Sequence, residues 1–130
     1  MRKHIYNFRD LLIWQKAMDL VERIYRVTQG FPKEELYGMT SQIRRSAISV
    51  PSNISEGHAR RSTKAYLSFL SVAYGSLAEL ETQLILCNRL GYLRDESSEE
   101  LLSLSAEIGR MINGLINSLS SKAGQDKQNG

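Results

Sequence analysis

The fold is decided by residues 63–90, which read TKAYLSFLSVAYGSLAELETQLILCNRL. Their apolar residues recur at alternating intervals of three and four positions, the spacing that places side chains on one face of an α-helix. The residues on this face are Tyr66, Leu70, Ala73, Leu77, Leu80, Leu84 and Cys87, and Gly91 follows as a stop signal. The stretch therefore predicts one long helix whose apolar stripe is buried against other helices.

Residues 10–29 predict a first helix with the same periodicity. Asp10 is a suitable N-cap, and Gly30-Phe31-Pro32 ends the segment. The side chains expected to face the core are Trp14, Ala17, Met18, Val21, Ile24, Tyr25 and Thr28.

A second helix is expected to begin between Glu34 and Thr40 and to reach about Glu56. Its apolar stripe consists of Leu36, Met39, Ile43, Ala47, Val50 and Ile54. Pro51 falls inside this stripe, and a proline in a helix interior removes one hydrogen bond and costs about 3 kcal/mol. Because the stripe continues to Ile54, we predict one kinked helix in preference to two helices.

Residues 98–119 predict the last helix, opened by a capping box in which Ser97 pairs with Glu100. Its expected core residues are Leu101, Leu104, Ile108, Met111, Ile112, Leu115 and Leu119. Residues 120–130 are polar and aperiodic, so we expect a disordered tail. Four helices with short connections predict an all-α fold, an antiparallel up-down four-helix bundle formed by residues 1–119.

The composition is typical of a small cytoplasmic protein. The chain has 130 residues, 42% of them hydrophobic, which is enough for one domain with its own core. A single cysteine cannot form an intrachain disulfide, so nothing favours an oxidising compartment. The longest uncharged run, residues 65–78, is shorter than the roughly 20 apolar residues that a transmembrane helix needs. We therefore expect a soluble, cytoplasmic chain without a membrane partner.

The net charge of +3 is unevenly distributed. An up-down bundle brings residues 1–9, residues 57–64 and the C-terminal tail to one pole, where cations greatly outnumber anions. Arg60, Arg61 and Lys64 lie at the start of the long helix, whose N-terminal dipole also favours anions. This basic pole predicts a phosphate-rich partner. Ordinary solvated charges are the alternative interpretation.

A second feature is the absence of charge from residues 46–55 and residues 65–78, which flank the same turn. On the long helix, the face opposite the core stripe carries Ser68, Ser71, Val72, Gly75 and Ala78. A helix that is uncharged all round is usually buried on more than one side. We therefore expect another copy of the chain to cover this face, the alternative being a solvent-exposed face of small residues.

Residue patterns that carry enzyme chemistry are missing from the sequence. His4 and His58 have no partners at metal-ligand spacing, and no phosphate-binding glycine loop or nucleophile elbow occurs. Cys87 lies on the apolar stripe and is interpreted as a core residue. We expect no catalytic residues, no metal, no cofactor and no small-molecule substrate.

Five motifs together resemble the bacterial four-helix-bundle proteins named for open reading frames in 23S rRNA intervening sequences. They are FRDL with WQKA (residues 8–17), FP with Glu35, YGMTSQIRR (residues 37–45), VPSNISEG (residues 50–57) and GSLAELETQ (residues 75–83). The resemblance extends over about residues 8–116 and implies a ring-like homo-oligomer, with a homopentamer expected. It implies no defined activity, RNA binding being the usual suggestion for this family. A similar bundle is the accessory protein of diversity-generating retroelements, a basic pentamer that associates with nucleic acid and a reverse transcriptase.

Two hypotheses about function follow. The first is a non-catalytic homo-oligomer that binds nucleic acid, RNA above all, with Arg60, Arg61 and Lys64 contacting phosphates. In this hypothesis Arg44 and Arg45 add contacts along the second helix. The alternative is a protein-interaction scaffold whose basic pole meets an acidic protein partner, in which Arg44 and Arg45 form ion pairs between subunits.

Overall fold

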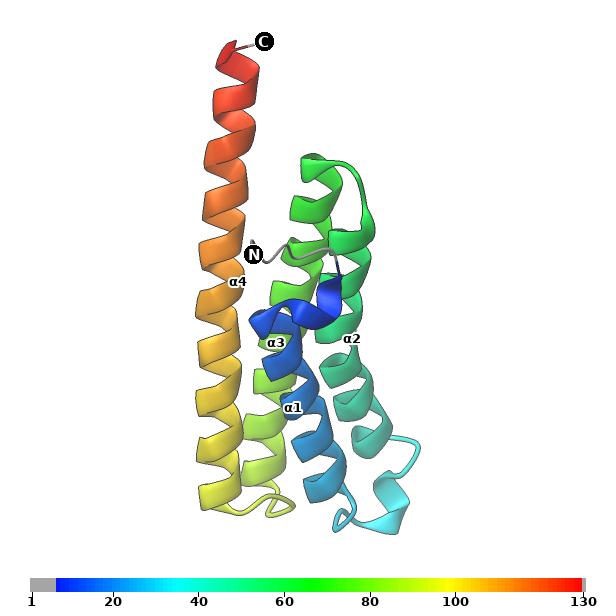
Figure 1. The fold of residues 1–130 in the computed structure, drawn as a ribbon. Coiled ribbons are helices and arrows are strands. Elements are labelled where there is room, and N and C mark those ends of the chain that lie inside the picture. Colours follow the sequence, from blue (N-terminus) through cyan, green and yellow to red (C-terminus); the bar gives the residue numbers. More distant parts are fainter. Residues whose placement is uncertain (1–6, 130) are drawn as a thin grey trace.

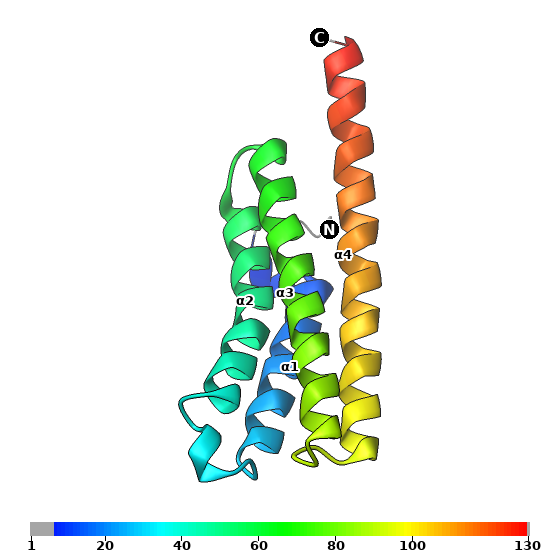
Figure 2. The same cartoon turned by 180° about the vertical axis from the view of Figure 1, so that it is seen from behind.

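Four helices form an antiparallel up-down bundle, as predicted (Figure 1). The structure is a computed structural model that describes residues 7–129, with side chains described up to residue 122. The elements are the 3₁₀ helix η1 (Phe8–Asp10), α1 (Leu12–Thr28), the 3₁₀ helix η2 (Lys33–Glu35), α2 (Met39–Ala59), α3 (Thr63–Arg89) and α4 (Asp95–Asn129). Each helix packs against the two helices beside it, and α1 and α3 lie diagonally opposite each other (Figures 1 and 2).

One hydrophobic core runs along the middle of the bundle. The side chains that are fully shielded from water include Leu20 and Ile24 of α1, Ile43 and Ile54 of α2, Leu70, Leu80 and Leu84 of α3, and Ile108 and Ile112 of α4. Burial of each such side chain contributes about 1.5–3 kcal/mol. The predicted stripe of α3 is confirmed, since six of its seven residues are buried and only Tyr66 is partly exposed.

The start and the buried face of α1 differ from the prediction. Asp10 is not the N-cap, because it belongs to η1, and α1 begins after Leu11. The core face passes through Ile13 and Leu20, whereas Trp14, Met18 and Val21 are half-buried beside it and Tyr25 is exposed. Phe8 of η1 packs edge-on against Trp14, with ring centres 5.2 Å apart. Trp14 therefore packs against the segment that leads into α1.

The prediction that α2 is continuous through Pro51 is confirmed, since α2 extends from Met39 to Ala59 with the proline buried inside it. Leu36, expected on its stripe, lies before the helix and is 49% exposed. The loss of one backbone hydrogen bond at Pro51 is offset by burial of the apolar residues on both sides, such as Val50 and Ile54.

Both ends of α4 differ from the prediction. The helix begins at Asp95, where Ser98 N–H bonds to the carbonyl of Arg94, so Ser97 lies within the first turn and the expected capping box does not form. It continues to Asn129, beyond the expected end at Leu119. The expectation of a disordered tail remains a prediction.

Unequal helix lengths shape one end of the molecule. The turn between α2 and α3 and the C-terminal half of α4 extend past the start of α1 (Figure 1). As a result, η1 and Arg9 lie well short of that end, and the expected gathering of residues 7–9 at the basic pole is wrong. Residues 1–6, also assigned to that pole, lie outside the described residues.

Candidate nucleic-acid interface

Three exposed cations surround the turn between α2 and α3. Arg60 and Arg61 occupy the turn itself, and Lys64 lies in the first turn of α3. We call this group the basic tip. Its one close acidic neighbour in the sequence is Glu56, exposed on the last turns of α2, so cations outnumber anions three to one within residues 56–64.

The backbone of the basic tip is fixed by two local features. Arg60 leaves α2 in an extended conformation while its N–H still bonds to the carbonyl of Gly57. Ser62 caps α3, since its hydroxyl accepts the N–H of Ala65 at 3.2 Å. A serine with extended backbone at this position satisfies one of the four N–H groups that a helix leaves without an internal partner.

Gly57 allows the two helices to meet closely just below the tip. A Cβ at this position would lie 2.8 Å from Cδ1 of Tyr66 and 2.9 Å from Cβ of Phe69, which is closer than real side chains pack. The second helix is expected from sequence to reach about Glu56, but Gly57 lies buried inside α2, which continues for two more residues. Its role is therefore close packing, not termination.

Aromatic rings of α3 support this end of the hairpin. The guanidinium carbon of Arg60 lies 5.1 Å from the centre of the Phe69 ring, a cation–π distance. His58 meets Tyr66 edge-on at 5.9 Å. Burial raises the pKa of Tyr66, which keeps its hydroxyl neutral. These contacts hold Arg60 against the helix, and they leave Arg61 and Lys64 exposed.

The N-terminus of α3 adds to the positive potential of the basic side chains around it. The N-terminal end of a helix carries a partial positive charge and N–H groups that point outward. Arg61 and Lys64 flank this end of a 27-residue helix. Side-chain cations beside a helix N-terminus suit a phosphate oxygen chemically.

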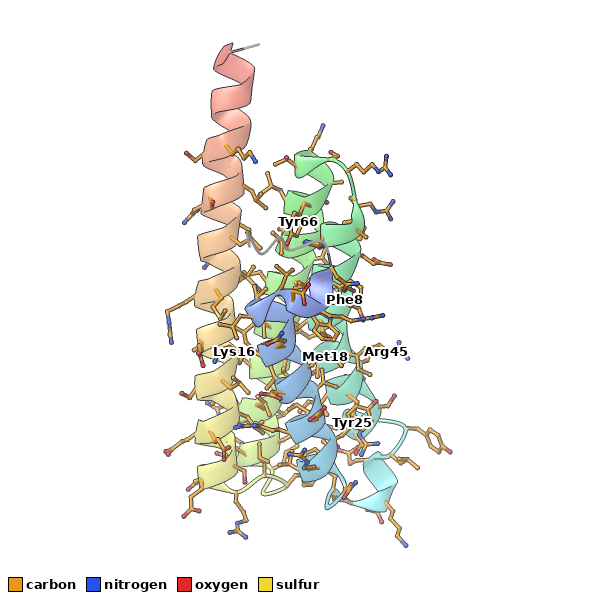
Figure 3. The ribbon with its side chains drawn as sticks, in the orientation of Figure 1. Phe8, Lys16, Met18, Tyr25, Arg45 and Tyr66 are labelled. Atoms are coloured by element: carbon orange, nitrogen blue, oxygen red, sulfur yellow. The ribbon has the colours of Figure 1, made fainter. Side chains whose placement is uncertain are left out.

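The structure does not bring Arg44 and Arg45 to the basic tip. Both lie in the first third of α2, and at about 1.5 Å of rise per residue Arg45 is about 22 Å from the turn. Figure 3 places Arg45 half-way along the bundle and Tyr66 near the end that carries the tip. The basic tip and the Arg44–Arg45 pair are therefore two separate groups of positive charge.

Arg44 has a structural position between α1 and α2. Its Nε donates a hydrogen bond to Oγ1 of Thr28 at 2.8 Å, and its guanidinium carbon lies 4.5 Å above the Tyr25 ring. Arg45 beside it is exposed. Arg44 uses its Nε donor and one face of its guanidinium within the chain, and the expectation that both arginines contact phosphate stays a prediction.

The residues expected to form the oligomer interface share one exposed face of α3. They are Ser68, Ser71, Val72, Gly75 and Ala78, all exposed in the single chain. A Cβ at Gly75 would meet nothing within 4 Å, so the surface is open there. In Figure 2, where α3 faces the viewer, this helix lies uncovered between α2 and α4.

Among the described residues no group of three or more His, Cys, Asp or Glu could hold a metal ion. Burial raises the pKa of the Cys87 thiol to about 11, so the thiol is protonated and inert at neutral pH. Within the part of the chain that the structure describes, no helix is long and apolar enough to cross a membrane.

Comparison with known proteins supports the architecture. The family described as 23S rRNA-intervening sequence protein matches residues 9–114. A crystal structure of a protein of unknown function from the S23 ribosomal protein family of Bacteroides thetaiotaomicron superposes with a TM-score of 0.76 at 26% sequence identity. That match covers 82% of this chain and 96% of the other chain. No curated protein matches the sequence.

Proposed function

This chain belongs to the family of 23S rRNA-intervening sequence proteins, and from that premise we propose that it is a non-catalytic homo-oligomer that binds nucleic acid through the basic tip. The observation that carries the proposal is the convergence of Arg60, Arg61 and Lys64 on the exposed turn at the start of α3. RNA in the cytoplasm is the proposed ligand, because the family description refers to a sequence within 23S rRNA.

The chemistry of the basic tip favours contacts to the nucleic-acid backbone. Arginine and lysine bind phosphate oxygens through charge-assisted hydrogen bonds, and the release of condensed counterions drives this binding. The five hollows that the structure describes are lined by residues away from the tip, so the proposal assigns to the tip contacts with the backbone and not with enclosed bases. Binding should therefore depend weakly on sequence.

One basic tip supplies too few contacts for tight binding. Several copies in one assembly present several tips to the same strand, and the later contacts become intramolecular. Self-association therefore strengthens the binding of nucleic acid by increasing avidity.

A salt titration tests the proposal. The binding of fluorescent RNA and DNA is measured by anisotropy from low to moderate salt for wild type and for the double variant R60E/R61E. The matched control is R89E/R94E, which makes the same change of charge at exposed arginines at the opposite end of the bundle. We expect the tip variant to lose affinity for all sequences alike, with the logarithmic salt slope reduced by about 0.7–0.9 for each lost contact.

Each outcome separates the candidate functions. Equal binding by wild type and both variants would place the nucleic-acid site away from the basic tip. A complete lack of binding by intact wild-type oligomer at low salt would contradict the proposal and favour the protein-interaction scaffold. Equal losses in the two variants would show that only total charge matters.

A further inference from the structure

A groove extends along the outer face between α1 and α2. Two hollows of about 300 and 440 Å³ lie on this face, and they share Ile48. One is lined from the α1 side by Phe8, Trp14, Met18 and Val21, and the other by Tyr25 (Figure 3). At its lower end lie Leu36 and Tyr37, and Tyr37 is 93% exposed. Such a groove leaves a large apolar surface in water.

The outer face of α3 carries the second uncovered surface. Its apolar residues Val72, Leu86 and Leu90 are about half exposed, and Ala78 is exposed between them. The exposed carboxylate of Glu79 lies on the same helix. This surface and the α1–α2 groove occupy different sides of the bundle (Figures 1 and 2).

The contact between α2 and α3 fixes the heights of these features along the bundle. The hydroxyl oxygens of Ser49 and Ser76 are 2.8 Å apart, so these residues lie level with each other. The two helices run antiparallel with the same rise per residue, so a step toward the N-terminus of α2 matches a step toward the C-terminus of α3.

This register places like features of the two surfaces at the same heights. Ile48 of the groove is level with the segment of α3 that presents Ala78, and Arg45 is level with Leu80, next to Glu79. An apolar residue of the groove therefore lies level with an apolar segment of α3, and the cation Arg45 lies level with the anion Glu79.

Charge complementarity identifies the occupant of the groove. Arg45 is exposed on the rim of the groove, and Glu79 is exposed on α3. Neither forms an ion pair within the residues that the structure describes. A rotation about an axis parallel to the bundle keeps every residue at its height, so Arg45 of one copy can meet Glu79 of the next.

We propose that the α1–α2 groove of one copy receives the outer face of α3 of the next copy, with Arg45 and Glu79 paired across the contact. The two surfaces differ, so the contact is head-to-tail, and it closes into a ring where the rotation from one copy to the next divides a full turn. All basic tips then point to the same side of that ring. The inference rests on the homo-oligomer of the proposed function and names its two surfaces.

Charge reversal with rescue tests the pairing. Sedimentation velocity at micromolar concentration compares wild type, R45E, E79R and the double variant R45E/E79R, with helicity checked by circular dichroism. We expect each single variant to shift the oligomer toward monomer, because two like charges meet at every contact. The double variant restores opposite charges and should assemble again. R94E, which changes an exposed arginine outside both surfaces, should assemble as wild type does.

The outcomes distinguish this inference from the proposed function. A wild-type protein that sediments as a monomer would contradict the homo-oligomer itself. A wild-type oligomer that both R45E and E79R leave intact would overturn the pairing alone and keep the oligomer. Dissociation of both single variants without rescue in the double variant would also overturn the pairing.

Discussion

Gly57 and Tyr66 set the distance between α2 and α3, since a Cβ on Gly57 would lie 2.8 Å from Cδ1 of the tyrosine ring. The residues are on facing helices directly below the basic tip. The absence of a side chain at residue 57 therefore determines how tightly the hairpin that presents Arg60 and Arg61 can close.

Gly57→Ala should destabilise the protein, because the added methyl group forces Tyr66 and Phe69 to move. The expected loss is about 1–3 kcal/mol in the free energy of unfolding, measured by urea denaturation. Gly114→Ala is the matched control, since Gly114 is also helical and a Cβ there meets nothing within 4 Å. The control should gain up to about 1 kcal/mol from helix propensity. A stabilised Gly57→Ala would contradict the close-packing role.

The periodicity of α3 could be predicted from sequence because the stripe is the only apolar arc with a regular three-four spacing there. In α1, by contrast, apolar residues cover two neighbouring arcs. Ile13 and Leu20 compete with Trp14 and Val21, and only the tertiary structure decides between them. Phe8 of η1 packs edge-on against Trp14, which lies half-buried beside the core face.

Local signals for helix ends were ambiguous for a similar reason. Residues 95–100 contain both Asp95 and the Ser97–Glu100 pair, and either could open a helix. The basic tip was predictable because its three cations are close in sequence. The proposed pairing of Arg45 with Glu79 required the Ser49–Ser76 register, which no sequence pattern contains.

Arg44→Ala should lower the stability of the protein, whereas Arg61→Ala should weaken its binding of RNA. Arg44→Ala removes the hydrogen bond to Thr28 and the contact with the Tyr25 ring, so it should lower the free energy of unfolding by about 1–2 kcal/mol. RNA affinity per folded oligomer should change little. Arg61→Ala should weaken RNA binding and change stability by less than about 0.5 kcal/mol. Urea denaturation and anisotropy on both variants measure the two effects. Loss of RNA binding in Arg44→Ala at full stability would return Arg44 to the nucleic-acid site.

The raised pKa of the Cys87 thiol predicts that the protein loses stability at alkaline pH. Burial raises the pKa of its thiol from 9.0 to about 11, with a further contribution from the charge of Glu35. Between these pH values the unfolded chain has released the proton and the native chain still holds it. The unfolded state binds fewer protons, so the free energy of unfolding falls as pH rises from about 9 to 11 and is unaffected below pH 9.

Cys87→Ala isolates this effect. Below about pH 9 the variant should be less stable than wild type by about 1 kcal/mol, because a buried group is removed. Its stability should decline less than that of wild type between pH 8 and 11, measured by urea denaturation at each pH. Tyr66, whose pKa is raised by burial, contributes equally to both proteins, whereas the part of the raised pKa of Tyr92 that comes from the charge of Cys87 is lost with the thiol. Equal declines in the two proteins would remove Cys87 as the cause.

Cysteine cross-linking distinguishes a head-to-tail ring from a two-fold dimer. Ile48 of the groove and Ala78 of α3 lie near the same height on different sides of the bundle. The native Cys87 is buried and should not react. In the double variant I48C/A78C, oxidation should link each copy to the next and give a ladder of bands under denaturing electrophoresis. The highest band then counts the copies in the ring, five being expected from the family resemblance.

The single variants supply the control for this experiment. A head-to-tail contact never brings residue 48 of one copy to residue 48 of another, so I48C alone and A78C alone should stay uncross-linked. An equimolar mixture of the two, exchanged before oxidation, should give covalent dimers and nothing larger, because each copy then carries one reactive thiol. Efficient dimers from I48C alone would instead indicate a two-fold contact through the groove.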